Sequence, residues 1–396
     1  MANEIVQYYV NNKNNTYCVM LDASQAFDRV HYCKLFKILL GKGLCPVVAR
    51  FTAVLYTNQK LRVRWGNYNS KEFPVRNGVK QGGVLSPIMF TNYLDELFLR
   101  LKRLKVGCYI GNMFAGALGY ADDVMLLGPT KYSVKLMLKT VSSFASEFNV
   151  KFNANKSKLV VYGVNNLNTE IKFENHILKA EGCSSHVGQL FGPDVKVKNV
   201  INCRKEFIAR VNYLMSTFRA ASYKVKFNLF KSYCMSLYGS VLWDYSASVV
   251  HNFYKTWRRC VRMLVDLPPR THSIYISHIL DDSPIETQLH KRFLKFLNSV
   301  LLNDNALLVL CGKLSINRSK SNVCNNFNFI CHKYNIKNKM SMFSNFGLMS
   351  EVSNQLSEPD QINISNIKDI LYIRDSMSTN FSKCELNDLI NYFAVN

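Results

Sequence analysis

Residues 117–127 read ALGYADDVMLL, an apolar run that two adjacent aspartates interrupt. The apolar residues on either side predict two short strands joined by a tight turn around Tyr120. This turn sets Asp122 beside Asp123 among apolar neighbours, where like charges repel each other and solvent gives little relief. Aspartate is also common at solvated hairpin tips. Two interpretations therefore stay open: a solvated turn, or a carboxylate pair that binds a divalent metal ion.

Another apolar run, residues 17–21 (YCVML), ends directly at Asp22. Its length is typical of a buried strand, so the chain carries a third carboxylate at a strand end. Hard oxygen ligands of this kind select Mg2+ or Mn2+. Two such ions about 3.5–4 Å apart promote in-line phosphoryl transfer. Together with Asp122 and Asp123, Asp22 is thus a candidate ligand of a phosphoryl-transfer centre.

The N-terminal half of the chain mixes strands with helices, which predicts the α+β fold class. Ser86 and Pro87 mark a helix start, because serine can cap and proline at the first helical position sacrifices no needed N–H. We expect further helices over 30–40, from Pro46 and over 132–148, a hairpin of a half-buried strand 61–65 with 72–75, and strands at 150–153 and 158–162.

The chain is strongly basic, since 50 Lys and Arg against 27 Asp and Glu give a net charge of +23. Such a charge opposes compaction unless an acidic partner neutralises it, and nucleic acid is the usual partner. A hydrophobic content of 48% excludes wholesale disorder. No apolar stretch has the length of a membrane span and no secretory signal is visible. We therefore expect an intracellular protein of the nucleus or cytoplasm.

From about Asn199 onward long helical patterns dominate, and residues 201–270 hold twelve Lys and Arg against three Asp and Glu, a net charge of +9. A solvated basic face is the plain interpretation. Aromatic residues between the cations favour a surface for a phosphate backbone instead. We expect Arg258, Arg259 and Arg262 to contact nucleic acid, with Arg258 and Arg262 on one helix face. The interleaved aromatic residues are Tyr213, Phe218, Tyr223, Phe227, Tyr233 and Trp257.

Beyond residue 310 the sequence is rich in Asn and Ser, which predicts loops over 315–328 and 341–366, with a last helix near 386–393. Twelve cysteines are scattered without a repeating spacing. Reduced, buried thiols are their expected state. The tightest group lacks the spacing of zinc fingers and knuckles; its members are Cys311, Cys324, Cys331 and His332.

Four motifs follow one another along the chain: LDASQAFDRV at 21–30, NGVKQGGVLSP at 77–87, YADD at 120–123 and NANKS at 153–157. In this order and spacing they resemble the first aspartate, Gln-Gly, Asp-Asp and Asn-Lys motifs of reverse transcriptases from non-LTR retrotransposons. One such match is weak, whereas four in the family's order are specific. The resemblance covers residues 16–192 well.

This resemblance implies a polymerase palm, an antiparallel sheet with packed helices, over residues 1–192. Two further stretches, LYGSVLW at 237–243 and LPPRTH at 267–272, look like the thumb region of arthropod-type elements. The implied thumb is helical and basic and spans 193–305, and an Asn/Ser-rich extension with a short terminal helix occupies 306–396. The implied partners are an RNA template, a DNA primer and dNTPs, with no membrane.

The resemblance also implies residue roles. Asp22 and Asp122 would bridge two Mg2+ ions, with Asp123 beside them and the Ala23 carbonyl as an extra oxygen. Phe27 would lie under the sugar of the nucleotide and exclude a ribose 2′-hydroxyl.

Three further positions complete the implied site. Gln81 and Gly82 would line the nucleotide and template pocket, and Lys156 would approach the triphosphate as a general acid or countercharge. Each has a plain alternative, since Gln81 could be a surface side chain and Lys156 a solvated lysine. Asp28 we interpret as a structural carboxylate and not as a metal ligand.

Two features depart from the family. Only 21 residues precede Asp22, fewer than the family's fingers region requires, and no endonuclease domain is present. Residues 186–188 (HVG) stand where the primer-grip motif has an aromatic residue, Leu and Gly. We expect a truncated reading frame in which the catalytic aspartates survive.

Three functions are compatible with these observations. The first is an RNA-directed DNA polymerase that adds dNTPs to a primer 3′-hydroxyl. The second is a catalytically silent nucleic-acid-binding relic of a truncated element. The third is another palm-fold nucleotidyl enzyme such as a cyclase, against which the Gln-Gly motif, Phe27 and the basic helical stretch argue, because a cyclase needs no surface that grips a duplex.

Overall fold

The computed structural model of the chain describes residues 1–334 except 164–167, 272, 274–275, 277–281 and 317–320. It contains two compact units, one over residues 1–193 and another that begins at Asp194. The first unit holds a mixed sheet with packed helices, and the described part of the second is helical. The α+β fold class is therefore confirmed.

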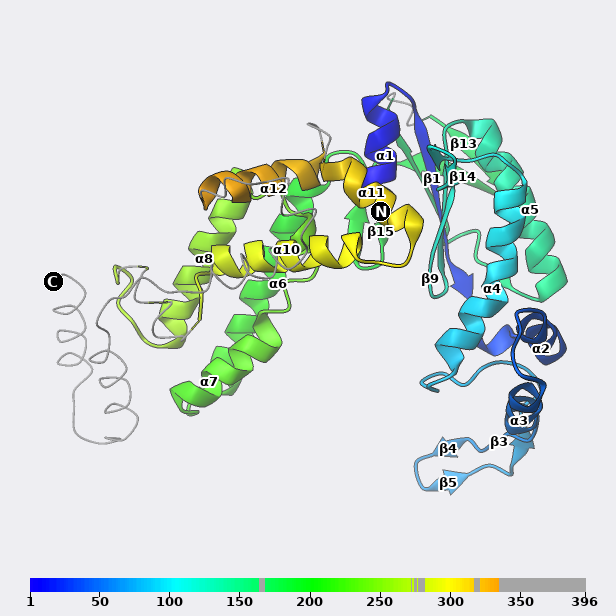
Figure 1. Cartoon of the computed structure of the whole chain (residues 1–396). Coiled ribbons are helices and arrows are strands. Elements are labelled where there is room, and N and C mark those ends of the chain that lie inside the picture. The colour runs from blue at the N-terminus through cyan, green and yellow to red at the C-terminus, as the bar shows by residue number, and fades with distance from the viewer. Residues whose placement is uncertain (164–167, 272, 274–275, 277–281, 317–320, 335–396) are drawn as a thin grey trace. The chain divides into compact units, whose positions relative to one another are not determined.

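A six-stranded sheet with the order β13-β14-β12-β1-β10-β9 forms the centre of the first unit (Figure 1). All neighbouring strands are antiparallel except β12 and β14. Every residue of β1 is buried, as its continuous apolar run predicts for an inner strand. The strands are β1 Thr16–Leu21, β9 Ala117–Tyr120, β10 Asp123–Gly128, β12 Lys158–Tyr162, β13 Glu170–Phe173 and β14 His176–Glu181.

Helices α4 (Ser86–Arg103) and α5 (Lys131–Phe148) pack on this sheet and share one apolar core with it. Helical spacing places Leu94, Leu97 and Leu101 on the buried side of α4. At the start of α4 the Ser86 hydroxyl does not cap the helix but donates to the Lys80 carbonyl at 2.6 Å. The remaining helices of this unit are α1 Ala2–Asn11, α2 Tyr32–Gly41, α3 Pro46–Thr57 and the 3-10 turn Phe27–Arg29.

Short paired strands join these elements. The predicted hairpin after α3 forms, but all its strand residues are exposed, so the prediction of a half-buried strand at 61–65 was wrong. Alternation there does not reflect burial, because no core face lies against either side of the ribbon. The short pairs are β3 Lys60–Leu61 with β6 Phe73–Pro74, β4 Arg64–Trp65 with β5 Tyr68–Asn69, β2 Ala23–Ser24 with β11 Lys151–Phe152, β7 Tyr109–Ile110 with β8 Met113–Phe114, and β15 Ser184–His186 with β16 Gln189–Phe191.

The second unit buries an aromatic-rich core between its helices. Phe207 of α6, Phe253 and Trp257 of α8, Phe293 of α10 and Phe327 of α12 all belong to it. Its elements are α6 Lys196–Thr217, α7 Tyr223–Leu229, the π-helical turn Phe230–Cys234, the 3-10 turn Ser240–Leu242, α8 Ser248–Leu264, α10 Ile285–Leu301, α11 Ala306–Ile316 and α12 Asn322–Lys333.

Helix α12 contradicts the loop predicted over 315–328. Asparagine disfavours helix interiors in general, but here two asparagines one turn apart bond to the backbone of the 242–245 segment. Asn322 Nδ2 donates to the Leu242 carbonyl at 2.8 Å. The buried Asn326 donates to the Trp243 carbonyl at 2.6 Å and accepts from the Tyr245 amide at 3.0 Å. The predicted loop at 341–366 and helix near 386–393 lie outside the described residues.

None of the helices in the described part of the chain has both the length and the apolar character of a membrane span. None of the described cysteines forms a disulfide bond, and Cys311, Cys324 and Cys331 are buried, whereas Cys33 and Cys45 are exposed.

Candidate functional site

Strand pairing brings the three aspartates to one end of the central sheet. Leu21, the last residue of β1, lies opposite Val124 of β10, so Asp22 follows β1 at the level where Asp123 begins β10. Asp123 in turn pairs with Tyr120 across the β9–β10 turn, whose two residues include Asp122. The predicted strand-turn-strand is therefore confirmed, and all three aspartates are half-buried at its end.

The charges of this cluster affect one another. Burial raises the pKa of Asp123, and the negative charges of Asp122 and Asp22 raise it further, while His186 opposes this shift. Burial lowers the pKa of His186, against a smaller opposite effect of Asp123. The folded chain thus disfavours the ionised form of Asp123, and a bound cation would offset this effect.

The donor set fits a hard divalent cation. None of the three aspartates forms an ion pair or a side-chain hydrogen bond with any described residue, so their oxygens are available as ligands. The side chains are not drawn in around one point: among the described residues, no three His, Cys, Asp or Glu side chains are arranged as a metal-holding group. The three carboxylates therefore lie at the same end of the sheet, and a bound cation would draw them together.

A tight turn after β11 contains Lys156, and the first residue of this turn is hydrogen-bonded to the backbone of Asp22. The Asn153 amide donates to the Asp22 carbonyl at 2.7 Å, and β11 pairs with β2, which contains Ala23. The Asn153 side chain accepts from the Lys156 amide at 3.3 Å, and Ser157 bonds back to the Asn153 carbonyl. The NANKS motif is thus a side-chain-capped turn attached to the end of β1, with the Lys156 side chain exposed.

Phe27, five residues after Asp22, is partly buried and packs against the core of the first unit. Its ring stacks on Phe90 of α4, with centroids 4.8 Å apart and an interplanar angle of 21°. Its carbonyl accepts from the Val79 amide at 2.8 Å, and the Val30 carbonyl accepts from the Gly78 amide at 2.9 Å. The first aspartate motif and the Gln-Gly motif therefore lie side by side.

Two glycines of the second motif differ in their surroundings. Gly78 has φ +92°, and a Cβ there would lie 2.9 Å from backbone atoms of Asp28. Gly82 has φ +78°, but a Cβ there would meet open space. Gln81 is exposed beside it. Gly78 is thus required by the chain's own packing, whereas Gly82 leaves room for something that approaches from outside.

Residues 184–191 form the hairpin whose motif departed from the family. Val187 and Gly188 make a two-residue turn between β15 and β16, both with positive φ, as a type I′ hairpin requires. His186 ends the first strand, and its charge interaction with Asp123 shows that this hairpin lies near the carboxylate cluster. The sequence interpretation missed His186 as a site residue, because nothing local in the sequence pairs it with Asp123.

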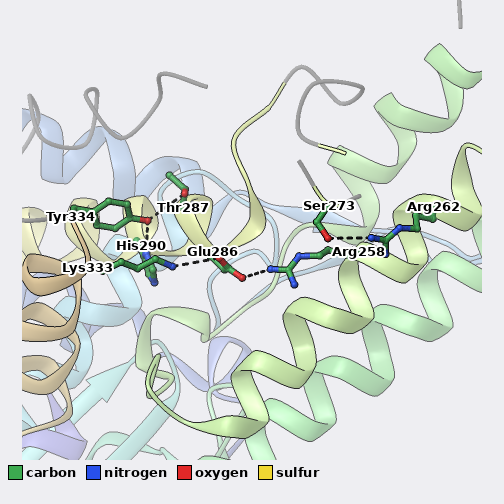
Figure 2. Close-up of polar contacts among 8 residues, drawn as sticks. All are labelled: Arg258, Arg262, Ser273, Glu286, Thr287, His290, Lys333 and Tyr334. Carbon is green, nitrogen blue, oxygen red and sulfur yellow. Dashed lines mark hydrogen bonds and ion pairs between the residues drawn. The ribbon is translucent and has the colours of Figure 1, made fainter. Parts of the chain in front are cut away.

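The second unit engages two of its three predicted nucleic-acid-binding arginines internally (Figure 2). Arg258 forms an ion pair with Glu286 of α10, which also pairs with Lys333 at 3.4 Å. Arg262 donates to the Thr271 carbonyl at 2.9 Å and to the Ser273 hydroxyl at 3.1 Å. Burial, and then the charge of Arg258, lowers the pKa of Arg262.

Arg259 is exposed, and so is Lys255 one turn earlier on α8. These two cations share one face of the helix because they are four residues apart. Sequence reasoning selected Arg258 and Arg262 by the same spacing and missed Lys255. The interleaved aromatic residues include both buried and exposed side chains. Trp257 lies in the core and is 2% exposed, whereas Tyr213 and Tyr233 are 58% and 50% exposed.

Comparison with known proteins finds a family match over most of the first unit. Residues 2–184 match the family described as reverse transcriptase (RNA-dependent DNA polymerase). The retrovirus-related Pol polyprotein of the type-2 retrotransposable element R2DM of Drosophila melanogaster is 31% identical over 140 residues, 35% of this chain and 13% of that protein. The Pol polyprotein of a type-1 retrotransposable element R2 of Nasonia vitripennis is 27% identical over 160 residues, 40% of this chain and 16% of that protein.

The matched stretches span 13% and 16% of the length of these two curated relatives. Among solved structures, apo telomerase from Candida tropicalis is similar with a TM-score of 0.40 and 14% identity, over 93% of this chain and 55% of that one.

Proposed function

We propose that this chain is an RNA-directed DNA polymerase, because residues 2–184 match the family described as reverse transcriptase and part of the chain is similar to Pol polyproteins of R2 retrotransposable elements. Its substrates would be an RNA template, a DNA primer and dNTPs. The observation that carries the proposal is the meeting of Asp22 with Asp122 and Asp123 at one end of the central sheet.

The chemistry of this cluster suits nucleotide addition. Asp22, Asp122 and Asp123, with the Ala23 carbonyl, would hold two Mg2+ or Mn2+ ions, whose charge stabilises a phosphoryl-transfer transition state. In the reaction a primer 3′-hydroxyl attacks the α-phosphate of a dNTP and pyrophosphate leaves. Lys156 would neutralise or protonate that leaving group. Gln81 and Gly82, which are exposed beside open space, would contact the nucleotide and template.

Primer extension on an RNA template tests the proposal directly. The full chain with Mg2+, a primer annealed to RNA and all four dNTPs should give products longer than the primer. Template-bound protein that gives no extension with Mg2+ or Mn2+ would favour the catalytically silent relic. Cyclic nucleotide formation without a template would favour a cyclase. The intracellular location stays a prediction.

Phe27 provides a test of sugar selection. Phe27→Val should raise ribonucleotide relative to deoxyribonucleotide incorporation on the order of 10-fold, since removing ring volume removes the penalty against one hydroxyl. The measurement is steady-state incorporation of rNTP and dNTP opposite the same template base.

Phe36→Val is the matched control for this change. Phe36 is a partly buried phenylalanine of α2 that packs on the same core, so its truncation repeats the loss of packing without opening the site. An active Phe27→Val protein with parental sugar preference would show that Phe27 serves packing on Phe90 alone.

The exposed face of α8 provides a test of duplex binding. The double variant Lys255→Gln/Arg259→Gln should flatten the slope of log K against log salt by up to about 1.8, because each phosphate contact on B-DNA contributes roughly 0.9. Binding of all sequences should weaken alike, since phosphate contacts do not read bases. Fluorescence anisotropy of a labelled hybrid duplex across a salt series measures both effects.

The control places the same charge change on the first unit. Lys135 and Lys139 are exposed and four residues apart on α5, and Lys135→Gln/Lys139→Gln should leave the slope at its parental value. An unchanged slope in the α8 variant would identify its charge as solvated only. Arg258 is unsuitable for this measurement, because its loss would leave Glu286 without its closest partner.

A further inference from the structure

The hairpin that follows α3 carries two exposed aromatic rings at its tip. The strands β4 and β5 lie at the end of the first unit away from the six-stranded sheet (Figure 1). Trp65 and Tyr68 are 84% and 83% exposed, although large aromatic side chains usually bury most of their surface. Of the chain's three tryptophans the other two, Trp243 and Trp257, are 3% and 2% exposed.

The backbone of the hairpin sets these rings on one face. Trp65 and Tyr68 are directly opposite each other in the β4–β5 register, and cross-strand partners point to the same side of a ribbon. Only Gly66 and Asn67 separate them, and Gly66 has φ +58°, as a two-residue hairpin turn with glycine in its first position requires. The tip therefore offers two adjacent rings on a short, tight turn.

The chain segment that carries the two rings is basic. Residues 60–80 contain six Lys and Arg against the single acid Glu72. Glu72 is already paired with Arg62 at 2.7 Å and Lys60 at 3.8 Å. The other four cations are exposed, with no acidic partner among the described residues; they are Arg64, Lys71, Arg76 and Lys80. The Arg64 Nε also donates to the Gly66 carbonyl at 3.1 Å, which holds one cation against the turn.

We propose that the tip of the β3–β6 hairpin binds single-stranded nucleic acid, with bases stacked on Trp65 and Tyr68 and phosphates near Arg64 and Lys71. Exposed aromatic rings among cations are the combination that single-strand binding uses, because every base has a face that can stack. Charge complementarity selects this partner over an apolar protein surface. The site consists of residues other than the carboxylate cluster and goes beyond the proposed catalytic function.

The test is affinity for a labelled oligouridine of about 12 nucleotides, measured by anisotropy with the full chain and no dNTP or metal. Trp65→Ala and Tyr68→Ala should each weaken binding about 5- to 150-fold, the range of one lost base stack. Trp65→Phe should stay close to the parent, whereas Trp65→Leu should resemble Trp65→Ala. A duplex of equal length should show no loss in Trp65→Ala, because its bases are stacked on each other.

A control variant separates stacking from other effects. Tyr132 is 73% exposed at the start of α5, and Tyr132→Ala should bind as the parent does. Binding is measured without metal or dNTP, so a failure of polymerase activity and a failure of this site are distinguishable. Parental affinity in both alanine variants, or in Trp65→Leu, would overturn the proposal.

Tryptophan fluorescence gives a second readout. Since Trp243 and Trp257 are buried, iodide quenching reports mainly on Trp65, and oligouridine should protect it. Protection that is already complete without RNA would mean that a protein surface covers the tip, which would also overturn the proposal.

Discussion

Replacing Asp122 by Asn is expected to abolish DNA synthesis while the chain stays folded. The loss of one charged ligand removes several kcal/mol of transition-state stabilisation, so at least about a 100-fold loss of primer extension should follow. Stability without metal should be equal or higher, because Asp122 is one of the charges that raise the pKa of Asp123. That raised pKa means that the folded state disfavours ionised Asp123 relative to the unfolded state.

The matched control is Asp28→Asn. Asp28 is exposed and lies in the same motif as Asp22, but we expect no metal contact from it. Extension by Asp28→Asn should remain within a few-fold of the parent. Thermal unfolding of Asp122→Asn well below the parental temperature would instead identify Asp122 as a structural residue.

Replacing Asn326 by Ala is expected to give a large loss of stability in the second unit. The Tyr245 amide would lose its partner in a buried place, at about 1–3 kcal/mol, and the Trp243 carbonyl would keep only the 3.2 Å bond from Asn322. A loss of about 2–4 kcal/mol lowers the Tm of this unit by roughly 5–20 °C. Tryptophan emission follows the transition, since Trp243 and Trp257 lie buried in this unit.

Asn325→Ala provides the comparison on the same helix. Asn325 is exposed, so this change alters helix propensity by the same amount without removing a buried hydrogen bond. Its Tm should equal or slightly exceed that of the parent. Equal Tm values for the two alanine variants would show that α12 does not hold the 242–245 segment.

Local periodicity explains which elements could be predicted. The unbroken apolar run of β1, the strand-turn-strand at 117–127 and the helix start at Ser86 are all formed where their patterns place them. Each depends on residues within a few positions of one another, and the sequence shows these directly. The resemblance of the motifs to those of a known family predicted that Asp22 and Asp122 lie together, and the register of β1 with β10 explains how they do.

Distant partners explain what could not be predicted. Arg258 and Arg262 looked like a free basic face by their spacing, but Glu286 and the Thr271 carbonyl engage them from other segments. His186 approaches Asp123 from a hairpin more than sixty residues later in the chain. The Asn-rich stretch was interpreted as a loop because the carbonyls that its side chains bind belong to residues about eighty positions earlier.

The different surroundings of Gly78 and Gly82 offer a way to distinguish a gene copy under selection for function from one that is no longer under selection. A copy released from selection could drift at Gly82, because any Cβ there enters open space and only its φ of +78° is strained. Drift at Gly78 would drive a side chain into the backbone of Asp28 and damage the fold itself. Among sister copies of this gene, an unchanged Gly78 therefore reports only that the protein folds. An unchanged Gly82 reports selection either for its left-handed backbone conformation or for whatever approaches it.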